Sequence, residues 1–249
     1  MAGHSKWKNI QHRKGRQDAL RGKVFTKISK EIYAAIRSGG DDPNTNLRLK
    51  TALQKARQNN MPNSNIENTI KKASGNMEGV TYEEIIYEGY GPAGVAVMVE
   101  CLTDNRNRTA ADVRHIFSKY GGNLGESGCV SYLFSRKGVL TLPIEDGGPD
   151  EDTLLMEALE AGAEDVRVED GIAEITTAPE DFDSVKQTLE GNGYQFQQAE
   201  LSLIPATTVN LEEEDAIKMM KLMEALEDND DVQDVHSNFD MDEEVMAKL

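Results

Sequence analysis

The fold class follows from residues 139–204, which read VLTLPIEDGGPDEDTLLMEALEAGAEDVRVEDGIAEITTAPEDFDSVKQTLEGNGYQFQQAELSLI. Short apolar runs alternate here with two stretches of helical periodicity, Asp152–Gly162 and Glu180–Gly191. The predicted strands are Val139–Leu142, Asp165–Val168, Ile172–Thr176 and Phe196–Ile204. This order is βαββαβ, the split βαβ arrangement of ferredoxin-like domains.

The flanking residues predict a second α+β domain that is interrupted by this unit. Before the unit we expect strands at Glu84–Gly89, Val95–Leu102 and Val130–Phe134, and a helix at Arg106–Tyr120. After it we expect a helix at Glu212–Glu227 and a strand at Val232–Val235. The predicted organisation is a discontinuous α+β domain of residues 79–136 and 206–249, with an acidic ferredoxin-like domain of residues 137–205 inserted in it.

Residues 1–78 are predicted to form a helical domain. Apolar residues recur at helical spacing in Asp18–Ser38 and in Asn44–Asn60, and Ser64-x-x-Glu67 predicts a capping box that opens a third helix. Each helix has one narrow apolar stripe, so the helices must pack on one another or on the next domain. The stretch ahead of them has almost no apolar face and predicts a basic arm that becomes ordered on a phosphate backbone.

The distribution of charged residues also divides the chain at the end of the predicted helical domain. Residues 1–77 contain 16 Lys and Arg against 5 Asp and Glu, whereas the whole chain contains 27 and 44 and has a net charge of −17. The remaining residues therefore carry 11 basic and 39 acidic side chains. A basic module hidden in an acidic chain indicates contact with nucleic acid through the N-terminal part.

The candidate nucleic-acid-binding residues fall into three groups. Lys23, Lys27 and Lys30 lie on one side of the first long helix, and Lys50 and Arg57 lie seven residues apart on the second. The predicted arm supplies Lys6, Trp7, Lys8, Arg13, Lys14, Arg16 and Arg21, with Trp7 placed either against a base or against the helices. Arg106 and Arg108 lie in the third group, at the start of a helix whose free N–H groups attract anions.

An ordinary capped turn is the alternative for the Thr103–Thr109 segment, with Thr103 or Asp104 as the cap. The glycine-rich segment Gly121–Gly128 precedes a predicted strand and does not fit a phosphate-binding loop. The sequence shows no metal-ligand spacing and no nucleophile motif, so we expect no enzyme activity, cofactor or metal; a hydrolase using the Asp104–Arg108 loop is a remote alternative.

The composition of the sequence limits where in the cell we expect the protein. No apolar run approaches the length of a membrane span, and the first residues lack the apolar stretch of a secretory signal. The two cysteines, Cys101 and Cys129, cannot form a disulfide framework and read as small buried thiols. We expect a cytoplasmic protein without membrane contact, and a monomer.

Several motifs resemble the YebC/PmpR family. They are Met1–Trp7 with Asn9-Ile10 and Arg13-Lys14, Asn59-Asn60-Met61-Pro62, Tyr87-Glu88-Gly89-Tyr90-Gly91-Pro92, Leu102–Thr109 and Gly121-Gly122-Asn123-Leu124-Gly125. The resemblance implies a bacterial protein with a helical domain and two α+β domains, one inserted in the other. It implies no enzymatic activity and no cofactor.

The resemblance leaves two kinds of target open. Members of the family are described as promoter-binding transcriptional regulators and as translation factors acting on ribosomes stalled at proline-rich stretches, and a mitochondrial relative activates translation of a cytochrome oxidase subunit. The sequence shows no helix-turn-helix signature and its helices are lysine-rich, which suits phosphate contact more than base readout. We therefore expect a ribosome-associated factor that binds ribosomal RNA, with a DNA-binding transcriptional regulator as the alternative.

Overall fold

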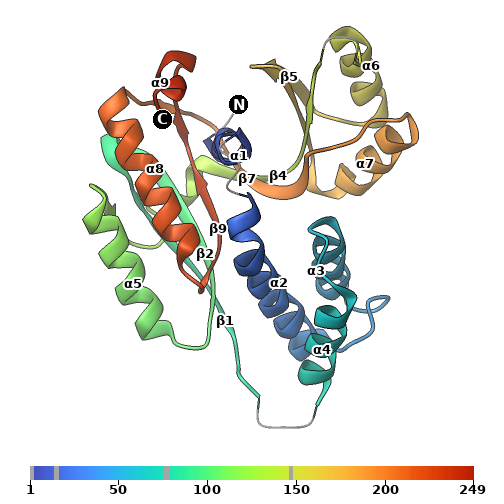
Figure 1. The fold of residues 1–249 in the computed structure, drawn as a ribbon, viewed down its shortest axis with the longest axis vertical. Coiled ribbons are helices and arrows are strands. Elements are labelled where there is room, and N and C mark those ends of the chain that lie inside the picture. The colour runs from blue at the N-terminus through green and yellow to red at the C-terminus, as the bar shows by residue number, and fades with distance from the viewer. Residues whose placement is uncertain (1–2, 14–16, 76–78, 146–147) are drawn as a thin grey trace.

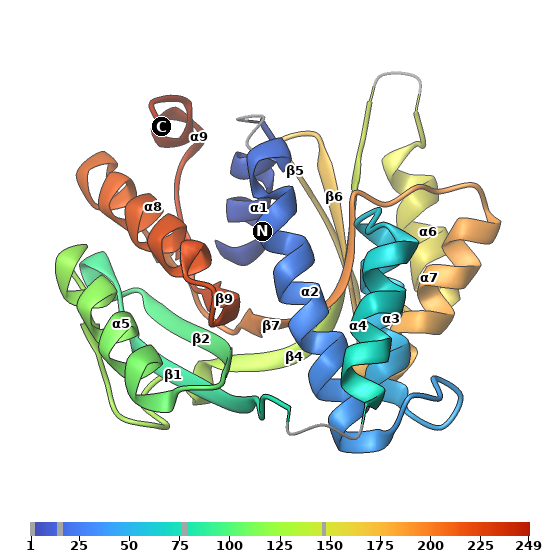
Figure 2. The ribbon, with the colours of Figure 1, turned by 60° about the horizontal axis from the view of Figure 1, so that its bottom comes forward.

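The computed structural model describes residues 3–13, 17–75, 79–145 and 148–249. It shows a helical part, α2–α4, beside two β-sheets that each carry helices (Figure 1). The predicted α+β class is confirmed. Helix α2 lies between α3 and α4 on one side and the first sheet with α8 on the other (Figure 2). No described helix is long and apolar enough to cross a membrane.

Helices α2 (Gln17–Gly39), α3 (Leu47–Gln58) and α4 (Asn63–Ser74) share one apolar core. Its centre consists of Ile28 and Ile32 of α2, Leu49 and Ala56 of α3, and Ile66 of α4. These residues recur at helical spacing, so each helix buries a single stripe and leaves its other side polar. Every residue of this core lies between Val24 and Ala73, so the three helices form a self-contained unit.

A Schellman turn ends α3 and sets the direction of α4. Asn60 adopts φ +56°, its N–H donates to the carbonyl of Arg57, and the Met61 N–H donates to that of Ala56. Met61 is buried in the helical core, and Pro62 is the N-cap of α4. The predicted capping box is wrong: α4 starts one residue before Ser64, and its cap makes no side-chain hydrogen bond.

The predicted basic arm is also wrong for residues 3–13, which form helix α1 (Gly3–Arg13); Lys14 and Arg16 lie outside the described residues, and Arg21 lies in α2. Trp7 is 2 % exposed, and both Trp7 and Ile10 belong to the apolar core of the first sheet. Alone, the segment has too little apolar surface to fold, but two large side chains suffice when a preformed core accepts them. By its packing, α1 joins the α+β body and not α2–α4.

The first sheet has the strand order β3-β1-β2-β9, formed by Asn123–Leu124, Glu83–Tyr90, Ala96–Thr103 and Val232–Ser237. Alternate β2 residues, including Val97 and Val99, pack with Phe117 of α5 (Arg106–Lys119) and Met219 of α8 (Glu213–Asp228). The expected strand at Val130–Phe134 is instead a 3-10 turn over Ser131–Leu133. Short parallel strands β8 (Val209–Asn210) and β10 (Phe239–Asp240) and helix α9 (Glu243–Ala247) complete this part.

The second sheet has the predicted βαββαβ connectivity. Its strands are ordered β5-β6-β4-β7 and all pairs are antiparallel. The strands are Asp165–Glu169, Ile172–Thr177, Phe134–Pro143 and Gln198–Pro205, and the helices are α6 (Glu151–Ala161) and α7 (Phe182–Gly191). Leu154 and Leu189 of the helices pack against Leu140 and Ile175 of the sheet.

Candidate nucleic-acid interface

The three lysines predicted to face a polyanion face the protein itself. We call Lys23, Lys27 and Lys30 the α2 basic face, and residues 227–231, which end α8 and precede β9, the acidic turn. Lys23 Nζ lies 2.8 Å from Asp228 Oδ1, and Lys30 Nζ lies 3.4 Å from Asp231 Oδ1. The same ammonium groups donate to the carbonyls of Asp228 and Asp230, and Lys27 donates to that of Glu227. In this structure the α2 basic face is therefore covered.

Burial changes the electrostatics at the middle of this contact. It lowers the pKa of Lys27, and the nearby Glu227 and Asp234 carboxylates offset part of that effect. Asp231 is the innermost acid and is only 3 % exposed. It accepts hydrogen bonds from Arg108 and from the hydroxyl of Thr109, so its charge is satisfied from α5 as well as from α2.

The predicted contacts of Lys6, Trp7 and Lys8 with nucleic acid are corrected to internal ones. Lys6 is 3 % exposed, and its ammonium group donates to Glu169, Asp240 and the carbonyl of Met241. Trp7 Nε1 donates to Glu227 Oε1 at 2.8 Å, so the indole is held in the core. Burial alone would lower the pKa of Lys8, but Glu200, Asp234 and Glu227 around it raise that pKa above its usual range.

Four further predicted residues cannot be placed in the site. Lys14 and Arg16 lie outside the described residues, and the side chains of Arg13 and Arg21 are likewise outside the described part of the structure. Their assignment to nucleic-acid binding stays a prediction.

The Arg106 and Arg108 segment is a structural junction. Asn105, and not Thr103 or Asp104, caps α5, because its side chain accepts the N–H of Arg108. The Arg108 guanidinium binds Asp231 through two nitrogens and Asp104 through one, and Arg106 pairs with Glu83 at the surface. With Nε and Nη2 of Arg108 bonded to Asp231 and Asp104, the structure gives this residue a structural role, and its anion binding stays a prediction.

The exposed cations of the helical unit lie on its other sides. Lys50 and Arg57 of α3 are exposed, as predicted, and so is Arg37 at the end of α2; sequence reasoning missed two similar candidates, Lys71 and Lys72 at the end of α4. Among the described residues, none of these five side chains makes an ion pair. The missed signal was the Lys71-Lys72 pair, which follows the buried Ile66 and Ile70 stripe and must therefore point outward.

Helix α4 also presents amide side chains to solvent. Its start exposes Asn63, Ser64 and Asn65, and Asn68 follows on the next turn. The two helices α3 and α4 are joined by only four residues, and both pack on α2. This is a helix-turn-helix connection in the sense of two consecutive helices joined by a short turn; the sequence predicted both helices but not the left-handed turn at Asn60.

The glycine-rich segment forms a turn, as expected, and a buried carboxylate holds it. Glu88 of β1 accepts the N–H groups of Gly128, Val130 and Ser131 at 2.6, 3.2 and 2.6 Å. Burial alone would raise the pKa of Glu88, but these three donors hold it below its ordinary value. Glu88 of the Tyr87–Pro92 motif thus shapes the turn.

Comparison with known proteins assigns the family. Residues 5–76 match the family described as the TACO1/YebC protein N-terminal domain, and residues 82–239 match the TACO1/YebC second and third domain. The chain belongs to the TACO1/YebC family. Its α2–α4 unit falls within the first match, and both sheets fall within the second.

Relatives of this TACO1/YebC chain carry regulatory names. A protein of Halothermothrix orenii is 54 % identical over 250 residues, covering 100 % of this chain and 99 % of its own length, and one of Persephonella marina is 57 % identical over the full length of both. Each is named "Probable transcriptional regulatory protein". The crystal structure of a conserved hypothetical protein from Aquifex aeolicus matches with a TM-score of 0.80 and 50 % identity, covering 92 % of this chain and 94 % of that one.

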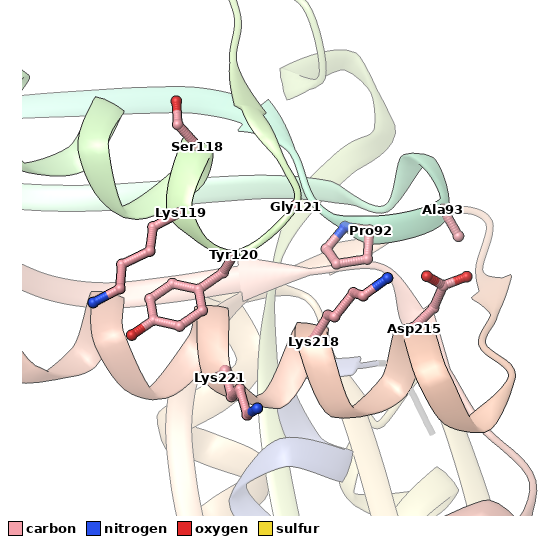
Figure 3. Close-up of a pocket in the computed structure, with 9 residues that line it drawn as sticks. All are labelled: Pro92, Ala93, Ser118, Lys119, Tyr120, Gly121, Asp215, Lys218 and Lys221. Atoms are coloured by element: carbon pink, nitrogen blue, oxygen red, sulfur yellow. The ribbon is translucent and has the colours of Figure 1, made fainter.

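A second cationic area of this TACO1/YebC chain lies on the acidic body. An open groove of about 540 Å³ runs between the Pro92-Ala93 turn, the end of α5 and the outer side of α8 (Figure 3). Lys119, Lys218 and Lys221 line it beside Tyr120, together with one acidic residue, Asp215. Lys218 pairs with Glu214 at 2.8 Å, whereas Lys119 and Lys221 form no ion pair within the described part of the chain.

One cluster of metal-ligand side chains joins the two sheets. His236 Nε2 lies 3.0 Å from Glu100 and 3.8 Å from Asp234, and its Nδ1 lies 3.3 Å from the hydroxyl of Ser202 on β7. Arg136 also binds Glu100, at 3.1 Å. Since the cluster already contains hydrogen-bonded and ion-paired groups from β2, β9 and β7, we assign it to joining the sheets.

Proposed function

We propose that this chain is a non-enzymatic regulator of gene expression that binds nucleic acid through the exposed sides of α3 and α4, with duplex DNA as its first target. One observation carries the proposal: the helix-turn-helix connection of α3 and α4 presents Asn, Ser and Lys side chains on its second helix. In such connections the second helix enters the major groove, and its first residues contact base edges.

The exposed side chains divide by chemistry into two roles. Asn63, Asn65 and Asn68 can donate and accept together, which is the pattern that reads adenine in the major groove. Lys50, Arg57 and the Lys71-Lys72 pair carry charge without an acceptor of their own, so they suit phosphate groups. The amides would give sequence preference, and the cations would give affinity and its dependence on salt.

The names of the relatives support a role in transcription. Proteins of Halothermothrix orenii and Persephonella marina that align along their full length are both named as transcriptional regulatory proteins. That name, together with the α3–α4 connection, supports promoter DNA as the proposed target of this chain.

A ribosome-associated translation factor is the second candidate, with ribosomal RNA as target and relief of stalling at proline-rich stretches as the activity. The groove lysines favour it, because Lys119, Lys218 and Lys221 lie on α5 and α8 and give the body a cationic area apart from α4 (Figure 3). Two separate cationic areas suit a large folded RNA, which presents phosphates on many sides.

The test compares duplex DNA and ribosomes with one set of variants. In K71Q/K72Q the affinity for the true target should fall roughly tenfold. The slope of log affinity against log salt concentration should become shallower, by the amount that corresponds to the loss of about two phosphate contacts. The matched control K137Q/R167Q removes the same charge from the inserted domain. N65A/N68A should relax sequence preference on duplex and leave the salt dependence unchanged.

The outcomes separate the two candidates. Sequence-preferring duplex binding that responds to K71Q/K72Q supports the DNA proposal. Ribosome co-sedimentation that responds to K71Q/K72Q, without preference among duplexes, supports the second candidate instead. Equal losses in K71Q/K72Q and K137Q/R167Q would contradict both, because the helical unit would then have no special part in binding.

A further inference from the structure

The contact between the α2 basic face and the acidic turn joins opposite charges within one chain. We propose that the α2 basic face is a second, concealed binding surface for a nucleic-acid backbone, and that the acidic turn occupies it until a phosphate backbone displaces the turn. The inference rests on the proposed function, because it takes the ligand to be a nucleic acid.

The acidic turn offers the same kinds of atom that a phosphate backbone would offer. Lys23 meets a carboxylate oxygen at 2.8 Å and a carbonyl at 3.0 Å, and Lys30 meets a carbonyl at 2.8 Å and a carboxylate at 3.4 Å. Lys27 lies between Lys23 and Lys30 in the sequence, and its ammonium group donates to the carbonyl of Glu227. These oxygens lie at the C-terminal end of α8 and just beyond it, where the helix dipole adds negative charge.

The two sides of the contact do not share an apolar core. Among the side chains that the structure describes, the core of α2–α4 contains no residue of the body and the core of the first sheet contains none of α2–α4, although Tyr33 of α2 meets Tyr82 edge-on at 5.6 Å. At the outer end, the side chains of Lys23 and Asp228 are 41 % and 66 % exposed, so water and salt reach the pair. At the inner end, Lys30 and Asp231 are 15 % and 5 % exposed, so opening also brings this pair into water, but it breaks up no shared core among the described side chains.

Opening also leaves no unpaired buried acid behind. Asp231 is the only member of the acidic turn classed as buried, and it keeps Arg108 and Thr109 as partners when Lys30 moves away. The one other carboxylate of the turn that contacts these lysines, that of Asp228, is at the surface, where water replaces the ammonium group. The body is therefore built to hold its acidic turn in the same shape with or without α2.

Because the chain is strongly acidic overall, covering the α2 basic face limits its attraction for polyanions. At a net charge of −17, an open basic face would add a local attraction for any polyanion, and the acidic turn suppresses weak encounters. A continuous backbone competes better than a small anion, because several phosphates engage at once and release counterions. Binding through α3 and α4 would bring such a backbone close to α2.

The decisive variant is D228K/D230K in the full chain, tested with a labelled duplex of random sequence and with ribosomes. Both positions are exposed, so the fold should persist, which circular dichroism checks. Repulsion should open the contact and raise the affinity about tenfold. The control D181K/D183K makes the same charge change at exposed positions of α7 and its preceding turn, and should raise affinity less than about twofold.

The K27Q variant, made in the wild-type chain and in D228K/D230K, separates two effects: exposure of the α2 basic face, and a general attraction of nucleic acid to the added positive charge. In the wild-type chain, K27Q weakens both the covered state and the nucleic-acid complex, so the effects largely cancel. In D228K/D230K the covered state is already lost, so K27Q should reduce affinity about fivefold. Equal effects of K27Q in the two backgrounds would overturn the proposal, as would equal gains in D228K/D230K and D181K/D183K.

These results distinguish failure of masking from failure of the proposed function. A wild-type chain that binds nucleic acid, and loses affinity in K71Q/K72Q, keeps the function even if D228K/D230K behaves as its control does. If neither the wild type nor D228K/D230K binds duplex or ribosomes at low salt, both the function and the concealed surface are wrong.

Discussion

The Arg108 guanidinium holds the buried Asp231 carboxylate with two nitrogens: Nε lies 3.1 Å from Oδ2 and Nη2 lies 2.8 Å from Oδ1. The pair joins the start of α5 to the residue that precedes β9. It therefore fixes the acidic turn on the body, and through Lys30 it fixes the place where α2 meets that turn. A residue that looked like a phosphate ligand instead positions an acidic segment.

Replacing Arg108 should destabilise the protein, whereas replacing Arg106 should not. R108A leaves Asp231 buried with fewer donors, which costs about 1–3 kcal/mol of unfolding free energy. Arg106 pairs with Glu83 at the surface, so R106A should cost less than about 0.5 kcal/mol. Urea unfolding of the two single variants measures the difference. Equal stabilities would contradict the assignment of Arg108 to the junction.

Glu88 should make stability depend on pH in the acid range. Its pKa lies below the ordinary value, so its carboxylate contributes stability fully above the unfolded pKa of about 4.3, and that contribution is lost as pH falls through the folded pKa. E88Q should therefore cost about 2 kcal/mol at neutral pH and progressively less below about pH 4. Thermal unfolding across this range tests it, with the exposed E126Q on the same turn as control.

Trp7 should report a buried indole that nucleic acid does not touch. It is the only tryptophan, so fluorescence needs no label. We expect blue-shifted emission, weak quenching by acrylamide, and no change in quenching when duplex or ribosomal RNA is added. Strong quenching by added nucleic acid in a folded sample would show that Trp7 stacks on bases after all.

The inserted domain should fold when it is expressed as residues 137–205. Its core of Leu140, Leu154, Ile175 and Leu189 draws on no residue outside it. It should show cooperative unfolding and should not bind nucleic acid, because residues 141–204 contain 17 acidic side chains against Arg167 and Lys186. An unfolded circular-dichroism spectrum would place the boundaries, or the insertion itself, in error.

The sequence by itself determined the elements whose patterns are local. Alternating and helical periodicities predicted the βαββαβ unit, the helices α2, α3, α5 and α8, and the strand β9, because residues two or four apart share a face in any context. Charge counting located the basic unit. Lys50 and Arg57 were found as exposed cations for the same reason, since their spacing places both on one side of α3, outside the stripe of Leu49 and Ala56.

Only the tertiary structure decided which partner each face meets. Periodicity shows that Lys23, Lys27 and Lys30 lie opposite an apolar stripe, but it cannot show that residues 227–231 fold back onto them from some 200 positions away. Trp7 and Lys6 were misassigned because a segment without its own apolar face can still be buried by a distant core. Long-range contacts of this kind depend on the packing of whole units, which no local pattern records.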